Sequence, residues 1–153
     1  MKKLAIDLNS DVGEGFGPYT MGQDEELFQY ITSANVACGY HAGDPSTIRK
    51  TLDLAVKHGI AVGAHPGYPD RLHFGRVTLP YSADEVTDFI LYQIGALQLM
   101  AERAGLTLQH EINVIRSVNK ANAGVFKHSG LKIFCNDTVR KILEDYLFFV
   151  PSF

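Results

Sequence analysis

Short apolar runs and amphipathic stretches alternate along the first part of this chain. The apolar runs are bounded by glycine, proline and polar residues, as is typical of buried strands, and the stretches between them place apolar residues at helical spacing. We expect strands at Lys3–Leu8, Ser33–Ala37, Ile60–Gly63 and Leu106–Gln109. We expect helices at Asp24–Ile31, Pro45–Lys57 and Ser82–Ala104. Glycine-rich loops separate the first strand from the first helix and the third strand from the last helix.

This alternation of strand and helix predicts an α/β fold. Right-handed crossovers between successive strands make the expected sheet parallel. Four strands with their helices form either part of a (β/α) barrel or a small open sheet, and hydrophobic spacing alone does not separate the two.

Two of the predicted helices carry clear start signals. Asp44 can accept backbone N–H bonds as an N-cap, and Pro45 suits the first helical position. Ser82 and Glu85 form a capping box before the longest helix, and Gly105 is suited to end it. These signals fix the two helices more firmly than the hydrophobic pattern does alone.

Beyond His110 the pattern changes, and periodicity is weak as far as Gly130. We therefore divide the chain into residues 1–110, the N-terminal part of an α/β domain, and residues 111–153, a divergent C-terminal segment of unknown role. Within that segment we expect a strand at Leu131–Cys135 and a helix that begins at Asn136 or Asp137.

Composition narrows the class of protein. A formal net charge of −3 over 153 residues, with no cluster of Lys and Arg, offers no basic face for nucleic acid. No apolar run approaches the roughly 20 residues of a membrane span, and the N-terminus lacks the apolar core of a signal peptide. The two cysteines, Cys38 and Cys135, lack the spacing of a disulfide framework or zinc knuckle. These features predict a cytoplasmic protein without nucleic-acid or membrane partners.

Three consecutive strand ends carry an acid or an imidazole, namely Asp11, His41 and His65. Ligands bind at the carboxyl ends of strands in α/β folds, so we expect these side chains to converge on one site. An Asp and two neutral imidazoles can bind a divalent metal ion, and the same groups can serve as catalytic acids and bases. Each residue alone could equally be a cap or a buried hydrogen-bonding group.

Other polar residues near these strand ends are candidates for binding substrate. Asp7 could instead satisfy backbone donors, Asp44 could be an N-cap alone, and Asp70 and Arg76 could pair with each other across their loop. The loop around Gly13 lacks the GK[ST] ending of a phosphate-binding P-loop. The substrate-binding candidates are Asp7, Asn9, Glu14, Asp44, Asp70 and Arg76.

Several long motifs, in order, resemble the LamB/YcsF family over about residues 4–110. This resemblance implies a partial (β/α) barrel-like fold related to the barrels of glycoside hydrolases and deacetylases. The motifs are DLNSDVGEGFGPYTMG (Asp7–Gly22), TSANVACGYHAGDP (Thr32–Pro45), GAHPGYPD (Gly63–Asp70), FGR (Phe74–Arg76) and LYQIGALQ (Leu91–Gln98).

The characterised members of this family form the A subunit of ATP-dependent 5-oxoprolinase. The resemblance thus implies ATP-driven ring opening of 5-oxo-L-proline to L-glutamate, in a complex with the B and C subunits. Two alternatives stay open: a metal-dependent deacetylase-like hydrolase, and a non-catalytic remnant that only binds ligand or partner subunits. The residues that match the family motifs are Asp7, Asn9, Asp11, Glu14, Cys38, His41, Asp44, His65, Pro66 and Asp70.

The likeness stops after His110, where the family continues with a VKPHGALYN-like motif and this chain reads Glu111-Ile112-Asn113-Val114. A frameshift, an interrupted gene or a fusion would each give this pattern. We therefore expect the chain to be inactive alone. Strand edges and apolar helix faces left open by a partial barrel favour association, so we also expect a homo-oligomer.

Overall fold

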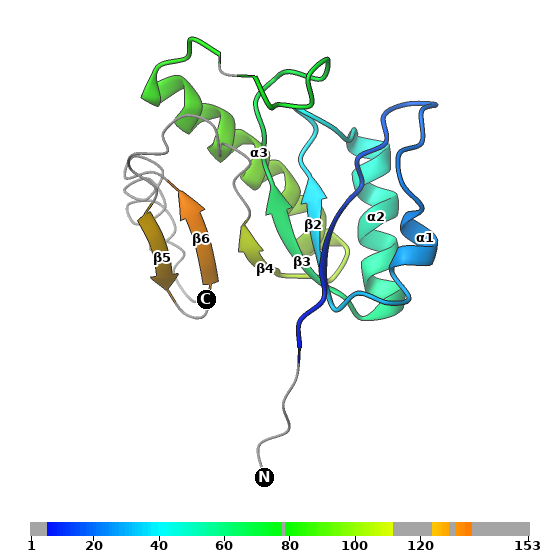
Figure 1. Ribbon diagram of the computed structural model, residues 1–153. Coiled ribbons are helices and arrows are strands. Elements are labelled where there is room, and N and C mark those ends of the chain that lie inside the picture. Colours follow the sequence, from blue (N-terminus) through cyan, green and yellow to red (C-terminus); the bar gives the residue numbers. More distant parts are fainter. Residues whose placement is uncertain (1–5, 78, 112–123, 129–130, 136–153) are drawn as a thin grey trace.

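A parallel sheet with helices forms the body of the molecule in a computed structural model that describes residues 6–77, 79–111, 124–128 and 131–135 (Figure 1). The strands of this sheet are β1 (Asn9–Val12), β2 (Ser33–Ala37), β3 (Ala61–His65) and β4 (Leu108–Glu111). The helices are α1 (Asp24–Leu27), α2 (Pro45–His58) and α3 (Ala83–Arg103).

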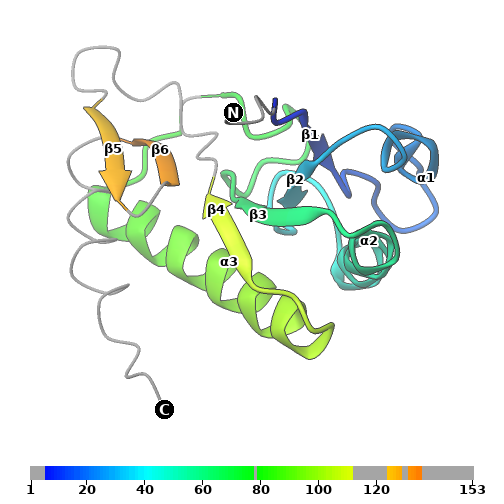
Figure 2. The same cartoon turned by 90° about the horizontal axis from the view of Figure 1, so that it is seen from below.

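The four strands lie in the order β1-β2-β3-β4, and every neighbouring pair is parallel. The register places Asn9 beside Ser33, and Ala37 beside His65. Helices α2 and α3 lie on the same side of the sheet and contact each other (Figure 2). The loops that follow β1, β2 and β3 therefore gather at one end of the sheet, and the predicted parallel α/β arrangement is confirmed.

The predicted helix signals operate as expected. The Asp44 side chain accepts hydrogen bonds from the backbone N–H groups of Ser46 and Thr47, and Gly59 closes α2 in the left-handed conformation. Ser82 and Glu85 form the capping box at the start of α3. Groups within a few residues thus satisfy the start of both helices and the end of α2.

The core lies between the sheet and its two long helices. Every residue of β2 is buried, as expected of a strand with neighbours on both sides. Helix α2 contributes Ile48, Leu52 and Ala55, whose spacing puts them on one face. The face of α3 that enters this core carries Val86, Ile90, Ile94, Leu97 and Ala101.

The first strand is not where the sequence predicts it. The apolar run at 3–8 predicts a buried strand, of which residues 3–5 lie outside the described residues. Ile6 is 88% exposed and Leu8 is 53% exposed, and β1 lies at Asn9–Val12. The loop prediction that began at Asn9 is wrong for these four residues. Polar residues form the strand because polar partners on β2 satisfy their side chains, a pairing that no hydrophobic pattern reveals.

The remaining elements differ in smaller ways. Helix α1 ends at Leu27, four residues earlier than expected, although Phe28 and Ile31 just beyond it are buried. The predicted strand at Leu131–Cys135 is present as β6, and it pairs antiparallel with an unpredicted β5 at Gly124–His128. Figure 1 shows this pair beside β4. The helix expected after Asn136 lies outside the described residues.

Length and apolar character together decide whether a helix can cross a membrane. None of the helices in the described ranges combines the two.

Replacing Ile90 by Asp tests the buried face of α3. Ile90 is 1% exposed, so the variant loses about 1.5–3 kcal/mol of hydrophobic burial and must also bury a carboxylate. We expect a clear fall in the urea midpoint of unfolding. Leu99→Asp on the same helix is the control, because Leu99 is 70% exposed and its substitution should change the midpoint little. Equal effects of the two variants would contradict the assigned face.

Candidate functional site

A row of polar side chains links β1 to β2 on one face of the sheet. Asn9 donates to the Ser33 hydroxyl over 2.7 Å, and Asn35 donates to Asn9 Oδ1 over 2.5 Å and to Asp11 Oδ1 over 2.8 Å. Ser33 and Asn35 are buried, whereas Asn9 and Asp11 remain exposed. Asp11, the last side chain of this polar row, lies near the carboxyl end of β1.

At that end the three residues predicted from the strand ends come together. The His41 and His65 rings meet edge to face, with centroids 4.7 Å apart. His65 Nε2 lies 3.7 Å from Asp11 Oδ2. Glu14 completes the cluster, because ligand atoms of Glu14, His41 and His65 all lie within 4.8 Å of one another. The structure thus adds Glu14, a substrate-binding candidate in the sequence, to the two imidazoles.

A tight turn after β1 delivers Glu14 to the cluster. Gly13 has φ +69°, and a Cβ there would lie 2.8 Å from the Thr51 hydroxyl oxygen on α2. The Gly13 N–H donates to the Asp24 carboxylate over 2.8 Å, which ties the turn to the start of α1. Glycine is therefore required at this position both by conformation and by space.

His41 lies in a cradle of backbone and aromatic groups. A Cβ on Gly67 would lie 2.7 Å from His41 Cγ and would also meet Nδ1. A Cβ on Gly75 would lie 2.9 Å from His41 Cβ, and the Phe74 ring meets the imidazole edge to face with its centroid 5.3 Å away. Both ring nitrogens of His41 are buried without a hydrogen-bond partner among the residues that the structure describes.

The electrostatics of the cluster follow from this burial. Burial lowers the pKa of His41 to about 4, the nearby His65 adds to the effect, and Asp11 opposes it. Burial also raises the pKa of Glu14, with further contributions from Asp11 and Asp24. Near neutral pH His41 is therefore a neutral imidazole whose lone pair is available to a cation.

Asp44 is the N-cap of α2 and also joins two loops. Its carboxylate accepts from the Gly17 N–H over 2.9 Å and from the Thr47 hydroxyl over 2.7 Å. These hydrogen bonds lower the pKa of Asp44 to about 2. The observed contacts account for Asp44 as a capping and loop-tethering residue, and its contact with substrate stays a prediction.

Arg71 holds the loops around the site, and sequence reasoning missed it. Its guanidinium donates to the carbonyl oxygens of Gly39 and Gly43, in the turn between β2 and α2. The same group lies 3.6 Å from the centroid of the Phe16 ring. An arginine in a loop carries no sequence signal for such a role, because its partners are backbone carbonyls and a distant aromatic ring.

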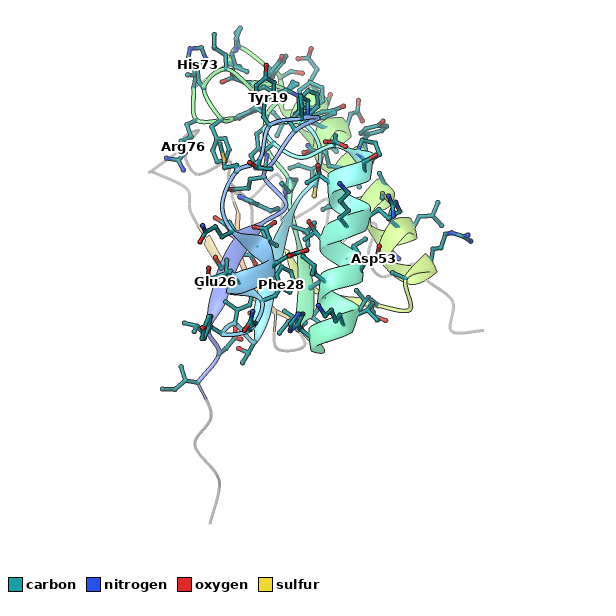
Figure 3. The ribbon with its side chains drawn as sticks, turned by 90° about the vertical axis from the view of Figure 1, so that its right-hand side faces the viewer. Tyr19, Glu26, Phe28, Asp53, His73 and Arg76 are labelled. Atoms are coloured by element: carbon teal, nitrogen blue, oxygen red, sulfur yellow. The ribbon has the colours of Figure 1, made fainter. Side chains whose placement is uncertain are left out.

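The loop after β3 contains the remaining candidates. Asp70 does not pair with Arg76 but contacts His73, whose backbone N–H and ring Nδ1 lie 3.1 and 3.0 Å from Asp70 Oδ1. Arg76 lies 5.3 Å from the Phe74 ring, and its charge offsets part of the rise in the pKa of Glu14 that burial causes. Figure 3 shows Tyr19, His73 and Arg76 at the end of the molecule where these loops gather.

The structure places Asp7 away from the cluster. It precedes β1, at the amino end of the sheet, and its two carboxylate oxygens accept from the hydroxyl groups of Thr32 and Ser33. These contacts tie the approach to β1 to the start of β2.

A family model described as the LamB/YcsF family matches residues 6–114, more than half of the chain. The chain belongs to the LamB/YcsF family. The matched segment contains the whole His41–His65–Glu14–Asp11 cluster.

Known relatives of this LamB/YcsF chain include the 5-oxoprolinase A subunits of several organisms. The Bacillus cereus protein is 54% identical over 105 residues, which cover 69% of this chain and 42% of the relative. The Pyrococcus horikoshii and Syntrophobacter fumaroxidans proteins are 56% and 59% identical over 107 residues, covering 70% of this chain and 42% of each relative. The chain therefore spans less than half the length of these relatives.

A solved structure supports the fold of the LamB/YcsF chain. The lactam utilization protein from Thermus thermophilus matches with a TM-score of 0.70 and 46% sequence identity. The match covers 72% of this chain and 44% of that protein. The predicted fold class, a partial barrel-like α/β fold with parallel strands, is confirmed.

Replacing Asp44 by Ala in the LamB/YcsF chain tests the N-cap. Removal should cost about 0.5–2 kcal/mol of stability at pH 7. A carboxylate whose pKa is lowered on folding stabilises the fold fully at pH values above its ordinary pKa near 4. This stabilisation is lost as the pH falls toward 2. The difference in the free energy of unfolding between Asp44→Ala and the parent, measured by urea unfolding, should therefore become smaller as the pH falls from 4 to 2.

The matched control is Asp53→Ala, on the same helix. Asp53 is an exposed partner of Arg49 at 3.7 Å, so its removal should change stability by only a few tenths of a kcal/mol. An Asp44→Ala effect no larger than this would contradict the capping role.

Proposed function

We propose that this chain acts as the A subunit of an ATP-dependent 5-oxoprolinase, which hydrolyses the cyclic amide of 5-oxo-L-proline to L-glutamate. The observation that carries the proposal is the imidazole–carboxylate cluster at the carboxyl end of the sheet, because it lies in the segment shared with relatives of that name. Since those relatives are named as one component of a larger enzyme, we place the activity in a complex with the B and C subunits.

The cluster has the groups that opening a lactam requires. The oxygen of water must bond to the ring carbonyl carbon, the C–N bond must break, and the nitrogen must gain a proton. Glu14 is suited to accept a proton from water because its raised pKa brings it closer to neutral pH. His65, beside Asp11, is suited to deliver a proton to the nitrogen. ATP hydrolysis in the complex would drive the ring opening.

We further infer that Glu14, His41 and His65 hold a divalent metal ion, in place of the Asp11, His41 and His65 set expected from the sequence. The residues fit such an ion in two respects. Two imidazoles and a carboxylate are a donor set that Zn²⁺ accepts, and His41 buries ring nitrogens that no described residue satisfies. A bound ion would polarise the carbonyl of the substrate, and Glu14 and His65 would then serve as its ligands in place of their roles as free base and free acid. Asp11 would then orient His65 from beside the site.

The same donor set favours a second candidate function, metal-dependent hydrolysis of an open-chain acetyl amide. Such a deacetylase would need the ion but neither ATP nor partner subunits. The two candidates therefore differ in what each reaction consumes, as well as in the substrate.

A coupled assay for ADP and glutamate tests the 5-oxoprolinase proposal. We expect no turnover of 5-oxo-L-proline by the chain alone, and turnover when the B and C subunits of a relative are added. Glu14→Gln should lower the turnover number by at least tenfold, because the amide cannot accept the proton. Glu25→Gln is the control, since Glu25 is exposed on α1, and it should leave turnover unchanged.

Each other outcome of the assay has a defined meaning. Turnover by the chain alone would overturn the need for a complex. Release of acetate from acetylated amides without ATP would favour the deacetylase. Inactivity in both assays, with the B and C subunits present, would leave a chain that only binds ligand or partners. Light scattering on the chain alone tests the predicted homo-oligomer. The cytoplasmic location stays a prediction.

Zn²⁺ titration calorimetry tests the metal proposal without an activity assay. Glu14→Gln should weaken Zn²⁺ affinity by at least tenfold, because it removes a charged ligand. Asp11→Asn should weaken it less, because Asp11 would act only through His65. The reverse order of effects would restore the set expected from the sequence, and absence of binding to the parent chain would exclude the site.

A further inference from the structure

A buried glutamine on α3 grips the loop that lies against His41. The Gln93 side chain is 1% exposed in a helix face that is otherwise apolar. Its Oε1 accepts from the Gly67 N–H over 3.0 Å, and its Nε2 donates to the Gly67 carbonyl over 2.9 Å. The second Nε2 hydrogen goes to the Phe89 carbonyl at 2.9 Å. Both N–H donors and the carbonyl oxygen of the amide group are thus engaged, so the side chain is fixed in one orientation.

Gly67 in turn forms one wall of the His41 cradle. Its missing side chain leaves the space that the imidazole occupies, since a Cβ would lie 2.9 Å from His41 Cβ and closer still to the ring. Gly75 and Phe74 close other sides of the cradle. Any displacement of the Gly67 backbone would therefore be transmitted directly to the His41 ring.

The contact with Gly67 takes the place of the hydrogen bond that usually orients a functional histidine. Imidazoles in active sites and metal centres are commonly aimed by a hydrogen bond from one ring nitrogen to a carboxylate or carbonyl. His41 makes no such bond to any residue within the described ranges, although both nitrogens are buried. Steric contact is then what holds the ring edge to face with His65.

We propose that Gln93 is a positioning residue that, through the backbone of Gly67, holds the His41 imidazole toward His65 and Glu14. No contact between Gln93 and the cluster is involved, and its action depends on the loop between them. Its consequence for metal binding rests on the proposed function, whereas its consequence for the orientation of His41 does not.

Gln93→Leu tests this proposal in the full chain, because leucine has similar volume and cannot hold Gly67. Two readouts follow: the ring signals of His41 in long-range ¹H–¹⁵N spectra at fixed pH, assigned with His41→Ala, and the affinity for Co²⁺ followed by visible absorption. We expect the His41 signals to shift or broaden and Co²⁺ binding to weaken by about tenfold or more. Gln98→Leu is the control, since Gln98 lies on the same helix and its side chain donates to Glu102 at the exposed surface.

Gly67→Ala keeps Gln93 intact and introduces the Cβ that would meet His41. It should reproduce both changes, and if Gln93→Leu does not fold, unchanged His41 signals in folded Gly67→Ala still overturn the proposal. If either folded variant lowers thermal stability yet leaves the His41 signals and Co²⁺ affinity as in the parent, the contact is purely structural and the proposal is overturned. If the parent binds no Co²⁺, the metal proposal fails, and the His41 signals alone still decide the role of Gln93.

Discussion

The parallel pairing of β2 between β1 and β3 is the constraint on which the site depends. Because all three strands run in one direction, Asp11, His41 and His65 emerge at the same end although they are far apart in the chain. β2 can lie between β1 and β3 because its side chains are small or of moderate size and can be buried on both faces of the sheet. The chemistry of the cluster therefore depends on a strand that contributes no catalytic group of its own.

Much of the fold could be predicted because local signals agree with the hydrophobic pattern. The capping groups of α2 and α3 and the glycine that closes α2 act within a few residues of the chain, so the sequence displays them directly. β1 could not be placed, because Asn9 and Asp11 become acceptable strand residues only when Ser33 and Asn35 stand opposite them. A strand stabilised by cross-strand polar contacts has no period-two hydrophobic signature.

The candidate site likewise has one part that the sequence predicts and another part that depends on tertiary contacts. The convergence of Asp11, His41 and His65 follows from strand ends and parallel order, which a sequence pattern can indicate. The inclusion of Glu14 depends on the turn at Gly13, and the grip of Gln93 on Gly67 depends on how α3 packs across the loop. A polar residue on an otherwise apolar helix face is a signal that could have singled out Gln93, but not its partner.

The polar row between β1 and β2 also helps to fix the register in which β1 pairs with β2. β1 has four residues and only one, Val12, that is buried, so apolar contacts give little reason to prefer one alignment over the next. A slip of one residue would turn Ser10 and Val12 toward Asn35 and remove the acceptors that its buried amide now has at Asn9 and Asp11. The same slip would take Asp11 away from His65. The buried Asn35 thus favours both the correct strand alignment and the assembled site.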